Sequence, residues 1–156
     1  TSDAAAARRL RRKKKSPPIL IGWREWAAFP ELGVPRIKAK VDTGAKTAAL
    51  HAYRVETRFR GGVEYAEFYV CPQQKRRRPE IFCTSPVVDR RGIRSSNGVV
   101  EQRLIIRTSL SLGEREWPID VSLADRDAMG FRLLLGRDSF RMKFLIDPKA
   151  SFLLGK

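Results

Sequence analysis

Residues 36–52, RIKAKVDTGAKTAALHA, contain the strand and the turn that decide the fold. Apolar side chains at Ile37, Ala39 and Val41 alternate with basic ones, which is the period of a half-buried β-strand. The strand ends at Asp42, and Thr-Gly follows at once. An aspartate in this position either forms an Asx-turn with its own backbone or acts as a chemical reagent. The rest of the chain decides between the two interpretations.

The period of two continues through most of the sequence. Turn residues, chiefly Gly and Pro, interrupt it about every 8 to 12 residues. Many short strands separated in this way predict a closed all-β fold. The predicted strands cover residues 19–29, 36–41, 47–60, 63–70, 99–112, 117–123 and 131–135.

The segments between the predicted strands are mostly polar. PQQKRRRPE at 72–80 and DRRGIRSSNG at 89–98 are predicted to be loops. DPKAS at 147–151 is predicted to be a turn, because Pro148 can fix its first central φ. RDSFRM at 137–142 is expected to form the one short helix, near the C-terminal end.

The chain is strongly basic, with a formal net charge of +15 over 156 residues. Residues 1–18 hold seven of the 32 bases and one of the 17 acids, which leaves 25 bases and 16 acids in residues 19–156. The hydrophobic content of 42% is that of a globular chain, and the length suits one domain. We therefore expect a disordered basic tail at 1–18, followed by a single domain at 19–156.

The basic tail admits two interpretations. Its cations at residues 8–15 could bind a polyanion such as RNA or anionic lipid weakly, by charge alone, or the tail is a solvated segment that aids solubility. The tail lacks the apolar segment of a signal peptide, and no run of 18 apolar residues exists in the sequence. We therefore expect no transmembrane segment and a cytoplasmic location.

Cys71, Cys83 and His51 are the soft metal ligands of the sequence. They lack CxxC or HExxH spacing, and the chain has no GxxxxGK[ST] loop for nucleotide phosphates. We therefore expect no metal, no ATP and no other cofactor. Two cysteines in a cytoplasmic chain imply no disulfide framework, although they allow one disulfide.

Several blocks of the sequence resemble one known family. The segments KVDTGA and LLLGRDSF look like the two halves of a retropepsin-type aspartic protease domain. More closely, SSNGVVEQR, GEREWPIDVSLADRDAMGFRLLLGR and FLIDPKASFLLG resemble a bacterial family named ATP-dependent zinc proteases, whose genes often lie near those of ATP-grasp peptide ligases. The resemblance covers residues 19–155. It implies a closed retropepsin-like barrel with one short C-terminal helix.

The resemblance also implies a catalytic loop made of Asp42, Thr43 and Gly44. An aspartic protease needs two carboxylates that share a proton, and this sequence has one Asp-Thr-Gly. The second Asp42 would then come from another copy across a two-fold axis, so that the expected protein is a homodimer. Thr43 would brace the two loops, and Gly44 would allow a tight turn. By the same resemblance, Gly136 and Arg137 support the dimer or the active site.

The residues after the loop depart from the family pattern, which often has an acid there. This chain has Lys46 after Ala45, and both are candidate substrate-binding residues. A cation so near favours ionised carboxylates and works against the shared proton. Together with the basic domain, it favours either a site active at more neutral pH or an acidic peptide substrate. Alternatively, Lys46 is a surface charge that points away from the site.

Two further features are candidates for substrate binding. His51 could line the cleft, although a single histidine in an apolar strand is more often packed in the core. The loop that contains Ser96, Asn97 and Gly98 is a candidate flap, because lids that exclude water are commonly Gly-containing loops. The alternative is an ordinary hairpin loop.

The leading hypothesis is a homodimeric aspartic endopeptidase that hydrolyses acidic or unfolded peptides through paired Asp42 carboxylates. Two alternatives stay open: a catalytically silent peptide-binding module of the same fold, and a polyanion-binding protein that uses the tail and KRRR at 75–78. An Asp42→Asn change separates the first two, since a binder keeps its affinity. Removal of residues 1–18 tests the third, through the salt dependence of binding.

Overall fold

The computed structural model of the chain describes residues 18–73, 78–94, 97–125, 130–140 and 143–155. The expected basic tail lies outside these residues, except for residue 18. Regular structure in the described part is nearly all β, with two short 3-10 helices, η1 (Pro30–Leu32) and η3 (Arg137–Ser139). The strands are β1 (Ile19–Phe29), β2 (Val34–Val41), β3 (Ala48–His51), β4 (Tyr53–Arg60), β5 (Val63–Val70), β6 (Ile81–Arg94), β7 (Val100–Leu112), β8 (Arg115–Ala124), β9 (Leu133–Leu135) and β10 (Phe144–Ser151).

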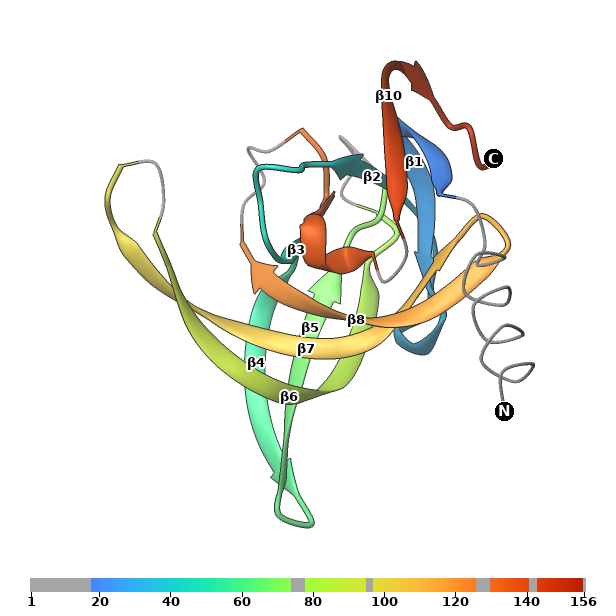
Figure 1. The fold of residues 1–156 in the computed structure, drawn as a ribbon. Coiled ribbons are helices and arrows are strands. Elements are labelled where there is room, and N and C mark those ends of the chain that lie inside the picture. The colour runs from blue at the N-terminus through green and yellow to red at the C-terminus, as the bar shows by residue number, and fades with distance from the viewer. Residues whose placement is uncertain (1–17, 74–77, 95–96, 126–129, 141–142, 156) are drawn as a thin grey trace, which may run out of the picture.

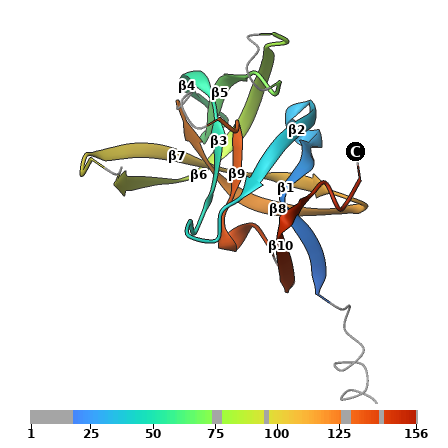
Figure 2. The same ribbon diagram turned by 90° about the horizontal axis from the view of Figure 1, so that it is seen from above.

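Part of the sheet closes into a ring. The hydrogen-bonded order β1-β2-β9-β3-β8-β7 returns to its start, because β7 pairs with β1 at Leu112↔Ala27 and Ser111↔Ala28. β10 adds to β1 in parallel on one side, and β6, β5 and β4 continue from β7 on the other. Figures 1 and 2 show this arrangement in two views, with the β6–β7 hairpin projecting from the barrel as an arm. The expected closed all-β fold is confirmed.

The hydrophobic core lies inside the ring and continues beneath β5. Its origin is visible in β2, where Ile37 and Ala39 are buried while Arg36 and Lys40 are exposed. Removal of apolar side chains from water is the main driving force of folding. The largest fully buried apolar side chains include Phe29, Phe68, Ile21, Ile37, Leu50, Ile105, Ile106, Leu110, Leu133 and Leu135.

The β6–β7 arm corrects one prediction. Residues 89–94, expected to lie in a polar loop, form the outer half of β6 and pair with β7 as far as Arg94↔Val100. Surface ion pairs such as Arg91 Nε–Asp89 Oδ2, at 2.9 Å, accompany this pairing. An exposed two-stranded arm lacks the apolar alternation of a half-buried strand, so the sequence pattern does not reveal it.

The segment 147–151, expected to be a turn, belongs to β10. The register with β1 shifts there, because Gly22↔Asp147 is followed by Arg24↔Ser151. Pro148 falls inside this bulge, where the lack of an N–H breaks no ladder hydrogen bond. The segment therefore turns locally while the strand continues.

The remaining differences concern the ends of elements. The helix expected at 137–142 is the 3-10 turn η3, and residues 141–142 lie outside the described part. The strand expected at 47–60 is two strands, β3 and β4, separated at Ala52. No helix in the described residues is long and apolar enough to cross a bilayer.

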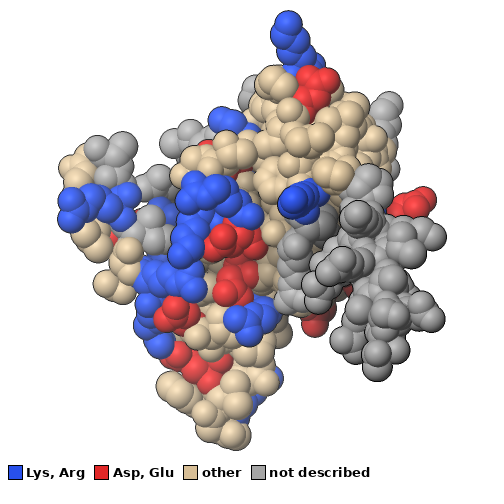
Figure 3. All heavy atoms as spheres, in the orientation of Figure 1, with Lys and Arg blue, Asp and Glu red and all other residues tan. Residues whose placement is uncertain are grey.

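Charged side chains of both signs lie together over β4 to β8, on the face shown in Figure 3. Arg58 Nε lies 2.7 Å from Glu67 Oε1, and Arg107 Nε lies 2.8 Å from Asp120 Oδ1. Exposed pairs of this kind add little to stability. Their main consequence is that the cations that form them are neutralised locally.

Glu25 in β1 is fully buried, and backbone N–H groups surround its carboxylate. Oε2 accepts hydrogen bonds from the N–H groups of Gly22 at 2.6 Å and Leu153 at 2.9 Å. Oε1 accepts one from the Leu154 N–H at 3.0 Å. A buried polar group destabilises the fold unless it is hydrogen-bonded, so these three bonds are what make Glu25 tolerable inside the protein. They fix the segment after β10 to the first strand.

Candidate active site

Asp42 lies at the point where β2 leaves the sheet. β2 pairs in parallel with β9, and the last pair of that ladder is Val41↔Leu135. One further hydrogen bond, from the Asp42 N–H to the Leu135 carbonyl at 2.9 Å, fixes the aspartate backbone to β9. The side chain of Asp42 is half-buried at the edge of the barrel, while Thr43 and Gly44 are exposed.

The Asp42 loop, residues 42–47, begins with a tight turn. The Gly44 N–H donates to Asp42 Oδ1 at 3.0 Å, and the Ala45 N–H donates to the Asp42 carbonyl at 3.2 Å. Asp42 therefore does form the Asx-turn that its sequence context allowed. Within the described residues, no other group of the chain hydrogen-bonds its carboxylate. The second oxygen is thus available to a water molecule or a proton.

Residues 136–138, which follow β9, support the Asp42 loop through backbone hydrogen bonds. The N–H groups of Arg137 and Asp138 donate to the carbonyls of Ala45 at 2.9 Å and Lys46 at 2.8 Å. The two backbones meet at Gly136, where a Cβ atom would lie 2.7 Å from the carbonyl carbon and oxygen of Lys46. Only a residue without a side chain allows so close an approach.

The Arg137 side chain adds a third connection. Its Nη1 donates to the Thr43 carbonyl at 2.8 Å, so the guanidinium of each chain holds the Asp42 loop of that same chain. The sequence predicted a supporting role for Gly136 and Arg137, and the structure brings both residues to the loop. A role of Arg137 across a dimer stays a prediction.

Trp117 in β8 is a supporting residue that the sequence did not indicate. Its Nε1 donates to the Ser139 carbonyl at 2.6 Å, and its ring lies against Phe140 with centroids 6.2 Å apart. These contacts anchor η3, which in turn supports the Asp42 loop. The alternation of β8 marked Trp117 as a core residue, and nothing in its local sequence separates this second role from simple burial.

The β6–β7 arm approaches the Asp42 loop from another direction. Arg91 Nη1 donates to Thr47 Oγ1 at 3.3 Å, which joins the middle of the arm to the residue after Lys46. Lys46 and Asn97 are exposed. At the outer end of the arm, Asn97 Oδ1 accepts a hydrogen bond from the Val99 N–H at 3.3 Å.

The candidate flap is thus the turn of this arm, with Gly98 at a φ of +84°. Ser96 lies outside the described residues. The hairpin passes beside the Asp42 loop and continues beyond it. That position is compatible with a lid, and the role itself stays a prediction.

His51 lies at the other end of β3 from the Asp42 loop. Its N–H donates to the Arg132 carbonyl, whereas Asp42 is bonded to Leu135 further along β9. At about 3.3 Å per strand residue, the two positions are roughly 10 Å apart along the strand. The His51 side chain is buried, and its Nδ1 lies 4.0 Å from Asp125 Oδ1. The structure therefore does not bring His51 to the Asp42 loop.

His51 instead lines a separate cavity of about 380 Å³. Tyr53 in this cavity donates to Glu80 Oε2 at 2.5 Å and lies 3.3 Å from Cys71 Sγ. Burial, followed by the contacts with Cys71 and Glu80, raises the pKa of the Tyr53 phenol above its ordinary value. The phenol therefore stays protonated above its ordinary range and donates to Glu80. Among the residues that the structure describes, no group of three or more His, Cys, Asp and Glu side chains could hold a metal ion.

Comparison with known proteins places the chain among retropepsin-like proteins. Residues 20–156 match a family model described as RimB-like, retropepsin-like aspartic endopeptidase RimB. A solved structure of a Legionella pneumophila protein of unknown function superposes with a TM-score of 0.72 at 26% identity, over 88% of this chain and 99% of that one. The matched description supports the aspartic class expected from Asp-Thr-Gly. It does not confirm the family name that refers to ATP and zinc.

Two sequence relatives carry a different name. Proteins of Desulfotalea psychrophila and Shewanella halifaxensis, each named "Probable alpha-L-glutamate ligase", are 47% and 45% identical to this chain over 137 residues. The match covers 88% of this chain and 30% of each relative, so the chain spans less than a third of their length.

Proposed function

Because the chain belongs to the RimB-like family of retropepsin-like aspartic endopeptidases, we propose that it hydrolyses peptide bonds as a homodimer, with one Asp42 from each copy. The observation that carries the proposal is the construction of the Asp42 loop. Three hydrogen bonds from residues 137 and 138 hold the loop, yet its carboxylate is bonded within the described chain by the Gly44 N–H alone. A carboxylate held rigidly by its backbone and left open at one oxygen suits acid–base chemistry.

The reaction follows from two such carboxylates that share one proton. The ionised carboxylate takes a proton from a water molecule while the water oxygen attacks the carbonyl carbon of the peptide bond. The protonated partner gives its proton to the carbonyl oxygen. When the tetrahedral intermediate collapses, the C–N bond breaks and the amine nitrogen receives the proton that the first carboxylate took from water. The second carboxylate takes a hydroxyl proton from the intermediate, which leaves a carboxylic acid product and restores the pair. The shared proton belongs to the pair of carboxylates and to neither chain alone.

We propose acidic or unfolded peptides as substrates. The chain carries a net charge of +15, and opposite charge attracts such peptides over long range. Two relatives carry the name "Probable alpha-L-glutamate ligase", which refers to an acidic residue. Glutamate-rich peptides are therefore the acidic substrates that we propose.

The test compares cleavage of an acidic peptide library by the wild-type chain, Asp42→Asn and Asp138→Asn. Asp138 is exposed, and its hydrogen bond to the loop comes from its backbone N–H, which the amide variant keeps, so that variant is a matched control for the side-chain charge. We expect Asp42→Asn to lower the rate by about 10²- to 10⁴-fold, because it removes an acid–base group, and Asp138→Asn to retain most of the activity. Equal rates for Asp42→Asn and the wild type would overturn the proposal.

A mixing experiment tests the two-chain site. Excess Asp42→Asn added to the wild type should form mixed dimers with one aspartate and suppress cleavage, while an equal excess of Asp138→Asn should not. If the rate of cleavage depends only on the amount of wild-type chain and does not fall when Asp42→Asn is added, a site shared by two chains is refuted. A wild-type chain that binds the peptides and leaves them intact would favour the catalytically silent module.

A further inference from the structure

One face of the β1–β2 hairpin carries basic and aromatic side chains. β1 and β2 are antiparallel, with Arg24 opposite Lys40 and Trp26 opposite Lys38. Arg36 lies on the same face of β2, because side chains two residues apart point to the same side of a strand. The buried residues of β2 lie between these positions and face the core. The basic face thus consists of Arg24, Trp26, Arg36, Lys38 and Lys40.

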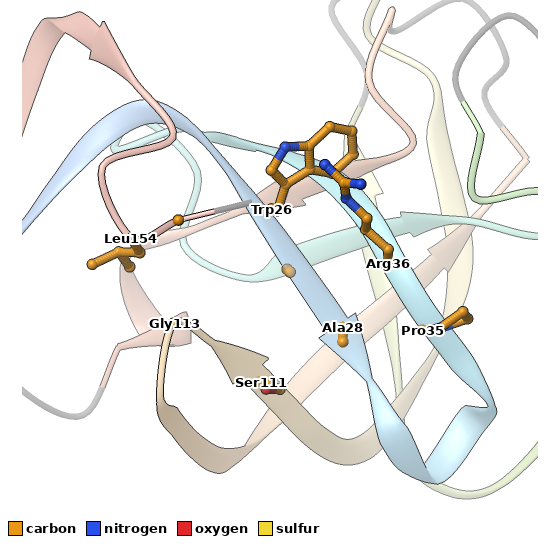
Figure 4. A pocket seen from close by; sticks show the side chains of 9 residues that line it. Trp26, Ala28, Pro35, Arg36, Ser111, Gly113 and Leu154 are labelled. Atoms are coloured by element: carbon orange, nitrogen blue, oxygen red, sulfur yellow. The ribbon is translucent and has the colours of Figure 1, made fainter.

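Trp26 is the centre of this face. The Arg36 guanidinium lies 3.7 Å from its ring centroid, and the Lys38 ammonium lies 5.3 Å from it. Phe152 stacks on the indole at 5.2 Å with the rings 17° apart. Figure 4 shows the Arg36 side chain lying against Trp26 at the mouth of a pocket. Contacts of this kind hold cations in position without neutralising them.

The face is hollowed on both sides of the Arg36–Trp26 contact. A cavity of about 190 Å³ lies toward Gly113 and Leu154, and another of about 480 Å³ lies toward Pro72 and Ile81. Both are lined by Trp26, Pro35 and Arg36, so they form one interrupted groove. The groove offers apolar walls to the body of a ligand and cations to its charges.

In the described part of the chain, three cations of this face, Arg36, Lys38 and Lys40, lack the carboxylate partners that several basic residues of β4 to β8 have. Within the described residues, no carboxylate forms an ion pair with Arg36, Lys38 or Lys40. Glu25, the acid nearest in sequence on β1, points into the core. Several cations of β4 to β8, in contrast, are ion-paired, among them Arg58 and Arg107. The basic face is therefore complementary to an anionic partner.

The spacing of the cations identifies the kind of partner. Arg36, Lys38 and Lys40 recur every two residues of a strand, which is about 6.6 to 6.8 Å. Alternate side chains of an extended peptide recur at the same distance. Lys40 is two residues from Asp42, so the row of cations leads to the proposed catalytic carboxylate.

We propose that the basic face of β1 and β2 is a subsite that binds an extended acidic peptide and delivers it to the Asp42 loop. Carboxylates at alternate positions of the peptide contact Lys40, Lys38 and Arg36 in turn. Trp26, which contacts Arg36 and stacks on Phe152, holds the cations in position. The delivery of the peptide to Asp42 rests on the proposed peptidase function. The binding itself does not depend on cleavage and is measured separately.

The binding experiment uses the full chain carrying Asp42→Asn, so that no peptide is cleaved. Fluorescence anisotropy compares labelled peptides of equal length and composition, one repeating Glu-Ser and the other Glu-Glu-Ser-Ser, with a Gln-Ser repeat as the uncharged control. We expect the Glu-Ser peptide to bind tighter than the Glu-Glu-Ser-Ser peptide by about twofold to fivefold, because every carboxylate then faces the cations. The Gln-Ser peptide should bind far more weakly.

Variants locate the binding on the molecule. Lys38→Gln and Lys40→Gln should each weaken Glu-Ser binding by about twofold to fivefold, and the loss should shrink in high salt. Arg60→Gln is the control, since it removes the same charge from β4, where Arg60 is 68% exposed and 3.7 Å from Glu67. It should change binding by less than about twofold. Unchanged circular dichroism confirms that each variant folds.

The outcomes distinguish this subsite from the peptidase itself. If Lys38→Gln and Lys40→Gln weaken binding while Arg60→Gln does not, the subsite is supported, even if the wild type cleaves nothing. If all three weaken binding equally, or if the two acidic peptides bind equally, the subsite is refuted. Cleavage of acidic peptides by the wild type would then still support the peptidase.

Discussion

Gly136→Ala is the substitution that most directly tests how the Asp42 loop is supported. The added Cβ would lie 2.7 Å from both the carbonyl carbon and the oxygen of Lys46, and 2.9 Å from the Ala45 carbonyl oxygen. All three are backbone atoms, so no rotation of a side chain relieves the overlap. The φ of Gly136 is −84°, which alanine adopts freely, so the effect is one of space alone.

The loop and the segment after β9 must then move apart. Separation weakens the hydrogen bonds from Arg137 and Asp138 to the loop, at roughly 0.5 to 1.5 kcal/mol each. Overpacking of a tight contact costs about 1 to 3 kcal/mol, so we expect a loss of that size in the free energy of unfolding. In a chain of this length the loss corresponds to about 3 to 10 °C in Tm. Displacement of Asp42 by about 1 Å would lower the rate of cleavage by roughly 10²-fold.

Urea unfolding and peptide cleavage measure the two effects. Gly92→Ala is the matched control, because its Cβ would meet the Val100 and Gln102 side chains, which can rotate away. We expect that variant to differ from the wild type by less than about 0.5 kcal/mol. A Gly136→Ala protein with the wild-type unfolding midpoint and rate would show that the close approach at Gly136 does not hold the loop.

Three further predictions concern other parts of the molecule. Glu25→Ala should lower the free energy of unfolding, measured by urea titration, by about 2 to 5 kcal/mol, because three backbone N–H groups lose their acceptor. A loss below about 1 kcal/mol, the value of one ordinary hydrogen bond, would contradict this prediction. Burial raises the pKa of the Cys83 thiol from 9.0 to about 12, so the folded chain keeps a proton that the unfolded chain loses. Stability should therefore fall by about 1.4 kcal/mol per pH unit between pH 9 and 12, and Cys83→Val should remove this slope. Arg137→Ala removes the 2.8 Å bond to the Thr43 carbonyl and should lower activity more than Arg137→Lys does, with sedimentation reporting any change in self-association; equal activity of the two variants would argue against the contact.

The strands with apolar alternation could be predicted from the sequence because each has one face in the core. Residues 36–41 are the clearest case, since every second side chain is buried. The outer part of β6 could not be predicted, because Asp89 and Arg91 are held by ion pairs on an exposed arm and follow no apolar pattern. β10 was missed in part because Pro148 signals a turn, and the bulge that accommodates it depends on pairing with β1, far away in sequence.

The candidate site shows the same division. Asp42 could be identified because strand and turn lie next to each other in the sequence, and Gly136 and Arg137 because a family resemblance joins the two segments. The supporting role of Trp117 could not be predicted, since its hydrogen bond to the Ser139 carbonyl requires β8 and η3 to be in contact. The row Arg36, Lys38 and Lys40 was visible as alternation, but its relation to Trp26 depends on the register of β1 against β2.

The burial of Glu25 has a consequence for the order in which the chain folds during synthesis. Its partners Leu153 and Leu154 lie 128 and 129 residues later in the chain, and β1 also awaits β10 on one edge. During synthesis from the N-terminus, the first strand emerges long before these partners and must keep its carboxylate hydrated. Contacts between such distant residues slow folding, and an unpaired strand edge invites association with other chains. The packing around Glu25 can therefore be completed only after residues 153 and 154 have left the ribosome. Until then the exposed edge of β1 makes the nascent chain, rather than the folded domain, the stage most exposed to aggregation.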